Sequence, residues 1–363
     1  MREPEGRICR GAAAVLALLV ALVRLSPALA GAAASEPPAT LRDTGLYADF
    51  AARVVDPRNL AFAPQYPLWT DGATKRRWIS LPPGTAIDAS DPENWVFPAG
   101  TRLWKEFAFG GRPVETRMIE RLADGSWRYA AYAWSADGSA ATLAPAAGLR
   151  ASYDLGGGRW HAIPSVGDCK VCHEGRPSPI IGFSLLQLSP DRDPNAPYAD
   201  PPPAPGVDLP YLVRAGLLTG LPQALLDHPP RIEAASPAER AALGYLHGNC
   251  GQCHASDGKL ANIGLYLRHM NADPVEDAVA STVDRPVKAP APGQTPDSRF
   301  RVEPGHPERS VLFERMASRW AAAQMPPLGT ELVDEDALGL VRQWIDGLDA
   351  NETTQAQQGG TRQ

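Results

Sequence analysis

The chain has 363 residues but only five cysteines, too few to indicate a disulfide framework. Cys9 lies in a leading segment that we expect to be removed. The other four form two close pairs, Cys169 with Cys172 and Cys250 with Cys253. No cysteine is therefore left for the disulfides that an exported protein of this size could otherwise use.

Long apolar runs are almost absent. The one clear run, residues 11–23, is shorter than the ~20 residues needed to span a bilayer, and Arg24 ends it. Three arginines precede it, and Ala28-Leu29-Ala30 follows as a small-residue cleavage site. We expect a cleavable signal peptide and a periplasmic or otherwise extracytoplasmic protein. Membrane contact is expected only if this segment stays uncleaved.

An excess of basic residues is also missing, since 35 Lys and Arg face 41 Asp and Glu for a net charge of −6. This acidic balance does not indicate nucleic acid and favours a basic docking partner. No two carboxylates stand at a spacing typical of acid–base catalysis, so we predict no catalytic residues.

The chain does contain one five-residue pattern twice. Cys169, Cys172 and His173 form the first copy, and Cys250, Cys253 and His254 form the second. Two cysteines three positions apart, followed at once by histidine, are typical of covalent haem c attachment. Each cysteine forms a thioether to a vinyl group, and the histidine is the first axial ligand of the iron. The pattern predicts two haem c groups; the alternatives for each pair are a zinc site or a redox dithiol.

Met325, in the segment Gln324–Leu328, is the candidate second axial ligand of the haem at Cys250 and Cys253. Its thioether is a soft donor that favours ferrous iron and raises the reduction potential. Prolines after it would stiffen the loop. The alternative is a methionine that fills a core gap. We expect Met316 to be core, and Met270 is the reserve candidate.

The second axial ligand of the haem at Cys169 and Cys172 is left open, because no methionine lies between His173 and His269. The candidates are His161, His228, His247 and His269, each of which could instead be an ordinary hydrogen-bonded histidine. A bis-histidine haem would be a low-potential relay, whereas an open iron could bind peroxide or another small ligand.

The predicted fold class is an α+β multidomain protein, in which an N-terminal antiparallel β domain precedes a mostly α-helical, cytochrome c-like haem region. Strand-like runs at 76–81, 103–109, 114–122 and 127–134 are separated by Asp-Gly and Gly-Gly turns, which favours a sandwich or small barrel. We divide the chain into a signal peptide (1–30), an approach segment (31–58), a β-rich domain (59–159), a first haem-binding segment (160–235), a cytochrome c-like domain with the second haem (236–349) and a disordered tail (350–363).

Helix signals are concentrated in the second half. Asp208 is expected to cap a short helix over 209–218, and a capping box at 236–239 to open one that delivers Cys250. A further helix is expected over 310–320. Asp334 is expected to cap a last helix that is apolar on one face.

Residues 236–349 resemble class I cytochrome c, in which the first and last helices cross. The resemblance lies in the order of a helix, Cys-x-x-Cys-His, Met-Pro-Pro and a last amphipathic helix. The further segments 66–73, 75–82, 163–165, 182–183, 187–188, 304–310 and 325–330, together with Asn249, extend the likeness to about residues 45–348. Together they look like a family of exported dihaem c-type cytochromes with an N-terminal β domain. The Leu68–Gly72 segment is distinctive, but the sequence assigns it no chemistry.

Three functions remain open. The first is an electron carrier between a periplasmic dehydrogenase and a downstream cytochrome or oxidase. The second is a dihaem peroxidase or oxidase whose first haem is open. The third is a redox module whose β domain binds a polymer or a partner protein. In that case the six tryptophans between residues 69 and 134 would form a binding surface; the alternative is that they pack in the core of the β domain.

Overall fold

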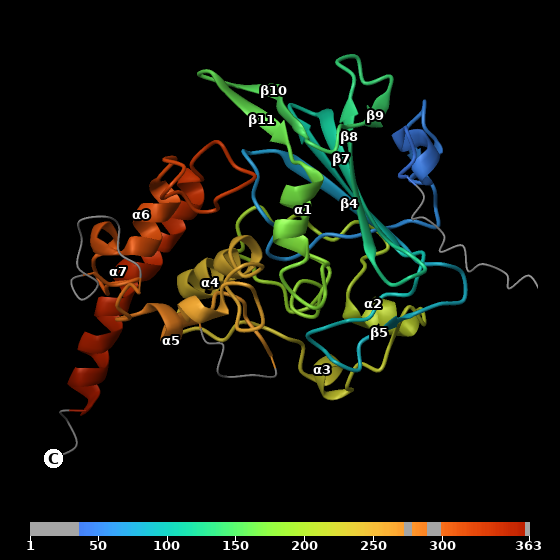
Figure 1. Cartoon of the computed structure of the whole chain (residues 1–363). Coiled ribbons are helices and arrows are strands. Elements are labelled where there is room, and N and C mark those ends of the chain that lie inside the picture. The colour runs from blue at the N-terminus through green and yellow to red at the C-terminus, as the bar shows by residue number, and fades with distance from the viewer. Residues whose placement is uncertain (1–35, 272–277, 289–298, 360–363) are drawn as a thin grey trace, which may run out of the picture. The chain divides into compact units, whose positions relative to one another are not determined.

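The main sheet has six antiparallel strands in consecutive order, β3-β4-β6-β7-β8-β9 (Figure 1). The strands are β3 (Leu60–Ala61), β4 (Thr74–Ser80), β6 (Arg102–Phe109), β7 (Arg112–Arg121), β8 (Trp127–Trp134) and β9 (Ala141–Leu143). The computed structural model describes residues 36–271, 278–288 and 299–359, with side chains described up to residue 348. The predicted signal peptide lies outside these residues.

Tight turns at predicted positions join the long strands. Gly110 and Gly111 link β6 to β7 with φ values of 55° and 78°, a left-handed backbone that glycine adopts without strain. The predicted hairpin at Asp124-Gly125 is confirmed, because Arg121 on β7 lies opposite Trp127 on β8. The strands form one open meander rather than a sandwich or barrel.

The two faces of the main sheet have different surroundings. Trp78, Trp104 and Met118 are cross-strand neighbours on one face, where they pack against η1 (Leu41–Thr44), β1 (Tyr47–Asp49) and β2 (Val54–Val55). Neighbouring positions point to the other face. That face includes Leu103 and Ile119 and forms part of a cavity wall.

Several smaller elements complete the first part of the chain. They are β5 (Ile87–Asp88), β10 (Leu149–Gly156), β11 (Arg159–Ile163), α1 (Val166–His173), α2 (Leu209–Arg214), β12 (Leu218–Thr219) and α3 (Ala224–Asp227). β5 pairs with β12 in parallel, and Phe62 and Leu103 share a core with Phe183 and Leu209. The sheet and the segment after the first motif are thus packed together. Pro37–Gln363 forms one compact unit.

The last third of the chain contains most of the remaining helices. They are α4 (Pro237–Asn249), η2 (Ala261–Ile263), α5 (Ala278–Thr282), η4 (Pro307–Arg309), α6 (Val311–Ala317) and α7 (Glu335–Gly359). α4 packs against α7 (Figure 1). Leu246 of α4 shares a core with Val341 and Trp344 of α7. No helix in the described part of the chain is both long and apolar enough to cross a membrane.

The predicted helix starts are confirmed. Tyr211 N donates to Asp208, Glu239 N donates to Ser236, and Ala337 N donates to Asp334. Each side-chain oxygen therefore satisfies a backbone N–H at the start of its helix.

The predicted fold class is wrong, however. The chain is β-rich, helices make up 23% of it, and the region predicted to bind haem is not mostly α-helical. α2 ends at Arg214 and α6 at Ala317, short of the predicted 218 and 320. The 37 prolines and 33 glycines explain the difference, because proline lacks an N–H donor and both residues are unfavourable inside helices.

Candidate haem-binding cavity

Both Cys-x-x-Cys-His motifs line one cavity of about 950 Å³. Its described lining includes Cys169, Cys172 and His173 from the first motif, Cys250, Cys253 and His254 from the second, and Met325. This volume lies at the upper end of the ~300–1,000 Å³ range of small-molecule sites. Residues 80 positions apart in the chain are thus brought together in one site.

α1 positions the first motif. Ser165 caps the helix, and Ser165 and Asp168 form a reciprocal capping box. Cys169, Cys172 and His173 are spaced i, i+3 and i+4, so they lie on one face of the helix. His173 Nδ1 donates to the carbonyl of Pro179 at 2.6 Å, which leaves Nε2 unprotonated and free to bind a metal.

The second motif follows α4 directly. Cys250 is the C-cap of this helix, and the turn continues as His254 N donates to the Cys250 carbonyl at 3.0 Å. His254 is buried, and its Nδ1 has no hydrogen-bond partner among the described residues. Within the described chain, His254 Nδ1 thus lacks a carbonyl acceptor of the kind that Pro179 provides for His173.

The four cysteines are free thiols. Burial raises the pKa of Cys250 to about 12 and that of Cys169 to about 11, so both stay protonated at neutral pH. A redox dithiol reacts as the thiolate instead. The described residues also contain no group of three or more His, Cys, Asp or Glu side chains arranged to bind a metal ion.

The cavity wall is apolar with an excess of positive charge, although the chain as a whole is acidic. The basic residues of the described lining are Arg77, Lys105, Arg117, Arg150, Lys259, Lys288, Arg301 and Arg315, and the acidic ones are Asp168 and Glu331. Haem has an apolar macrocycle and two carboxylates, so both features of the wall fit it. With the paired thiols and the two histidines, the residues present fit two haem c groups.

Met325 is the methionine candidate that the cavity favours. It lines the cavity, and its N–H donates to the Arg315 carbonyl at 2.9 Å. Met316 is a core residue, as predicted, although it also lines the cavity. The reserve candidate, Met270, is not among the described lining residues, and its sulfur accepts from Arg268.

None of the four histidine candidates is among the described residues that line the cavity. His161 is buried between two carboxylates, with Nε2 3.2 Å from Glu115 and Nδ1 4.0 Å from Asp71. His228 is exposed at the end of α3. His247 and His269 adjoin each other, because His269 N donates to His247 Nδ1.

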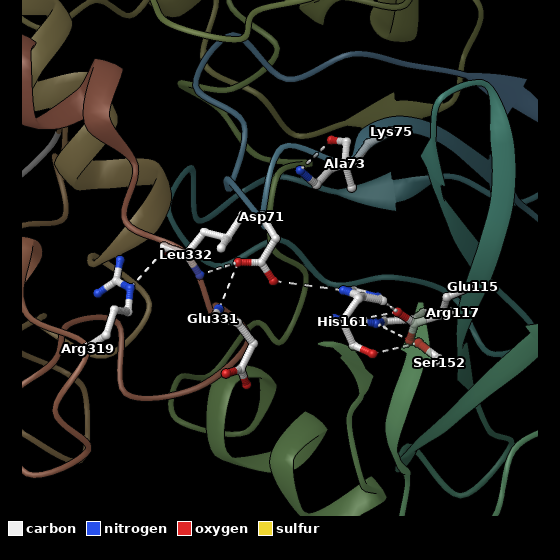
Figure 2. Close-up of polar contacts among 10 residues, drawn as sticks. All are labelled: Asp71, Ala73, Lys75, Glu115, Arg117, Ser152, His161, Arg319, Glu331 and Leu332. Carbon is white, nitrogen blue, oxygen red and sulfur yellow. Dashed lines mark hydrogen bonds and ion pairs between the residues drawn. The ribbon is translucent and has the colours of Figure 1, made fainter. Parts of the chain in front are cut away.

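Figure 2 shows the surroundings of His161. Glu115 accepts two hydrogen bonds from Arg117, at 2.6 and 2.9 Å. Burial raises the pKa of Glu115, but the charges and hydrogen bonds of Arg117 and His161 together outweigh it and lower the pKa. Burial lowers the pKa of His161, but Asp71 and Glu115 outweigh burial and raise it overall. His161 therefore contacts Glu115 of the sheet on one side and Asp71 on the other.

The Leu68–Gly72 segment, to which the sequence assigned no chemistry, contacts both the residue before the second motif and the loop that follows Met325. Trp69 N donates to Asn249, the residue before Cys250, at 2.7 Å. Asp71 accepts from the N–H groups of Glu331 and Leu332, at 2.7 and 2.9 Å, in the loop that follows Met325 (Figure 2). The sequence contained no signal for these contacts, because they join residues 180 to 261 positions apart.

Comparison of the chain with protein-family models, curated proteins and solved structures finds no match.

Proposed function

We propose that this chain is an exported c-type cytochrome that carries two covalent haems and transfers electrons between a periplasmic dehydrogenase and a downstream cytochrome or oxidase. One observation carries the proposal: both Cys-x-x-Cys-His motifs and Met325 line the same cavity. The proposal places the chain with the exported dihaem cytochromes that its sequence resembles. The leading apolar segment and the haem motifs support export independently, because haem c is attached outside the cytoplasm.

The residues of the cavity have distinct roles in this proposal. Haem c supplies a one-electron redox centre. Two thiols would hold each haem by addition of their S–H bonds across its two vinyl groups, which requires no oxidant. His173 and His254 bind the iron, and the Pro179 carbonyl orients His173.

The cavity wall would tune the reduction potentials. Met325 offers a soft sulfur ligand, which favours the ferrous state. Apolar residues such as Leu246 and Leu267 exclude water, and basic residues such as Arg301 and Arg315 add positive charge. The main sheet forms part of this wall, so we propose that the β region binds the cofactor.

The test is low-temperature EPR and an optical redox titration of the purified holoprotein. We expect two low-spin haems. Met325→Ala should abolish the weak long-wavelength band of a sulfur–iron bond and lower one reduction potential, whereas Met270→Leu should change neither. A protein that binds one haem or none contradicts the proposal.

A second function is favoured by the position of the histidines. Because none of the four candidates is among the described lining residues, the haem at Cys169 and Cys172 has no histidine or methionine partner assigned in the cavity. This haem would then keep an open position, as in a peroxidase. A high-spin EPR signal from one haem, together with cyanide binding and peroxide turnover, would support this function over the pure carrier.

A further inference from the structure

The main sheet carries a row of three basic residues on the face that lines the cavity. Arg77 on β4 lies directly opposite Lys105 on β6, and Lys105 lies opposite Arg117 on β7. All three line the cavity. Residues directly opposite each other on neighbouring strands point to the same face, where like charges destabilise the sheet.

On the other face of the same sheet, charged side chains form ion pairs across the strands. There, Glu120 lies between Arg102 and Arg128 in the cross-strand register and binds both. Arg76 and Glu106 also face each other and pair at 2.7 Å. The row that faces the cavity is thus an exception within one sheet.

Only one member of that row has a carboxylate partner. Glu115 pairs with Arg117 through two hydrogen bonds. Arg77 is 6% exposed, yet its guanidinium makes no hydrogen bond or ion pair among the described residues. The Lys105 ammonium likewise has no such partner there and contacts only the ring of Phe107, at 4.9 Å from its centroid.

Nearby groups do not neutralise these two cations. Lys75, on the same strand as Arg77, is another basic residue rather than a carboxylate, and its amine donates to the Ala73 carbonyl at 3.1 Å. Burial lowers the pKa of Lys75 to about 7. The charge of Asp200 acts on Arg77, but Asp200 is exposed and forms no ion pair with it. Arg77 is buried and Lys105 beside it is half-buried. Desolvated charges without partners are costly, so this pair indicates an anionic ligand.

We propose that Arg77 and Lys105 form a carboxylate-binding site on the sheet wall of the cavity. The planar guanidinium of Arg77 matches the two oxygens of a carboxylate, as the guanidinium of Arg117 does in the Arg117–Glu115 pair on β7, two strands away. The first motif contacts the same sheet, because the ring centroids of His173 and of Tyr129 on β8 are 5.5 Å apart. Arg77 and Lys105 line the same cavity as Cys172 and His173. The site therefore adjoins the first motif.

The carboxylate has two sources. If the proposed function is correct, on which this assignment rests, it is a propionate of the haem at Cys169 and Cys172. The other source is a free small carboxylate that enters the cavity. Both use the same two cations, and the test below distinguishes them.

The test compares the wild-type holoprotein with Arg77→Gln and Lys105→Met, each made separately. Arg112→Gln is the matched control, because Arg112 is an exposed arginine on β7 outside the described cavity lining. Haem per chain is measured first for every protein, and circular dichroism checks folding. Resonance Raman spectra then report the propionate bending mode, and acetate titrations at constant ionic strength report binding of a free carboxylate.

For a propionate, the bending mode should move to lower frequency in both site variants and stay unchanged in the control. For a free carboxylate, the wild type should bind acetate saturably, and either variant should weaken binding by about tenfold or more. If both readouts in Arg77→Gln and Lys105→Met match the wild type while haem is present, the site is overturned. A wild type without haem contradicts the proposed function alone, because the acetate arm still tests the site.

Discussion

Asp71 shows how one side chain can connect segments that the sequence does not relate. One of its oxygens accepts two backbone N–H groups from the loop after Met325, and the other lies 4.0 Å from His161 on the sheet side. Its own backbone is left-handed, with φ of 48°, a conformation that Asp tolerates better than most residues. Asp71 therefore positions the Met325 loop against the β region.

Replacing Asp71 tests this contact. Asp71→Ala leaves two N–H groups without an acceptor and should lower the free energy of unfolding by roughly 1–3 kcal/mol. Asp71→Asn keeps an amide oxygen and should cost less. Chemical denaturation measures both, and the sulfur–iron optical band should weaken in the alanine variant only. An alanine variant as stable as the wild type, with an unchanged band, would rule out this role.

Gly244 marks a close approach between α4 and the Tyr66 segment. A Cβ built on Gly244 would lie 2.0 Å from the Tyr66 ring, whereas one on Gly347 in α7 would meet nothing within 4 Å. Gly244→Ala should therefore destabilise the protein by about 1–3 kcal/mol or more. Gly347→Ala should stabilise it by about 0.5–1 kcal/mol through helix propensity. Thermal unfolding measures both, and equal effects would contradict the packing.

At the scale of elements, the main sheet is stabilised by rows of opposite charge that cross several strands. Glu120 on β7 accepts from Arg102 on β6 at 2.9 Å and from Arg128 on β8. Burial raises the pKa of Glu120, but the hydrogen bonds from Arg128 and Arg102 outweigh it, so the pKa lies below its ordinary value. The ionised carboxylate therefore stabilises the folded sheet.

This pKa gives a stability prediction with a defined sign. A lowered folded-state pKa contributes stability above the ordinary glutamate pKa of about 4.3, and this stability is lost as pH falls through the folded value. Glu120→Gln should cost about 1–2 kcal/mol at pH 7, allowing for the partly exposed Arg102. The difference from the wild type should shrink below about pH 4. Glu233→Gln, at an exposed ion pair, is the control and should change stability little at either pH. If the stability lost in Glu120→Gln is the same at both pH values, the ionised Glu120 carboxylate does not stabilise the sheet.

Local sequence signals predicted where helices begin and where strands turn better than how long the helices are. The caps at Asp208, Ser236 and Asp334 and the Asp124-Gly125 turn depend on neighbouring residues, and the structure contains all of them. The prediction of a mostly helical haem region was wrong, because capping signals do not reveal how soon a helix stops. The row of Arg77, Lys105 and Arg117 depends on strand register, and no local pattern in the sequence specifies which residues become cross-strand neighbours.

At the scale of the whole molecule, the cavity unites segments that the sequence suggested as separate domains. The main sheet, α1, the end of α4 and the Met325 loop all contribute to its wall. The paired cysteines could be recognised from the sequence because their chemistry requires a fixed spacing. The shared cavity could not, because it depends on contacts such as Trp69 with Asn249 across the chain.

The most direct test of the two-haem account is intact-mass and peptide mass spectrometry of the protein purified after export. The account predicts a chain that carries the mass of two haems, with one on the peptide containing Cys169 and Cys172 and one on the peptide containing Cys250 and Cys253. Changing Cys169 and Cys172 to alanine should remove one haem and leave the other. Unmodified thiols in both peptides of the exported wild type would contradict the account.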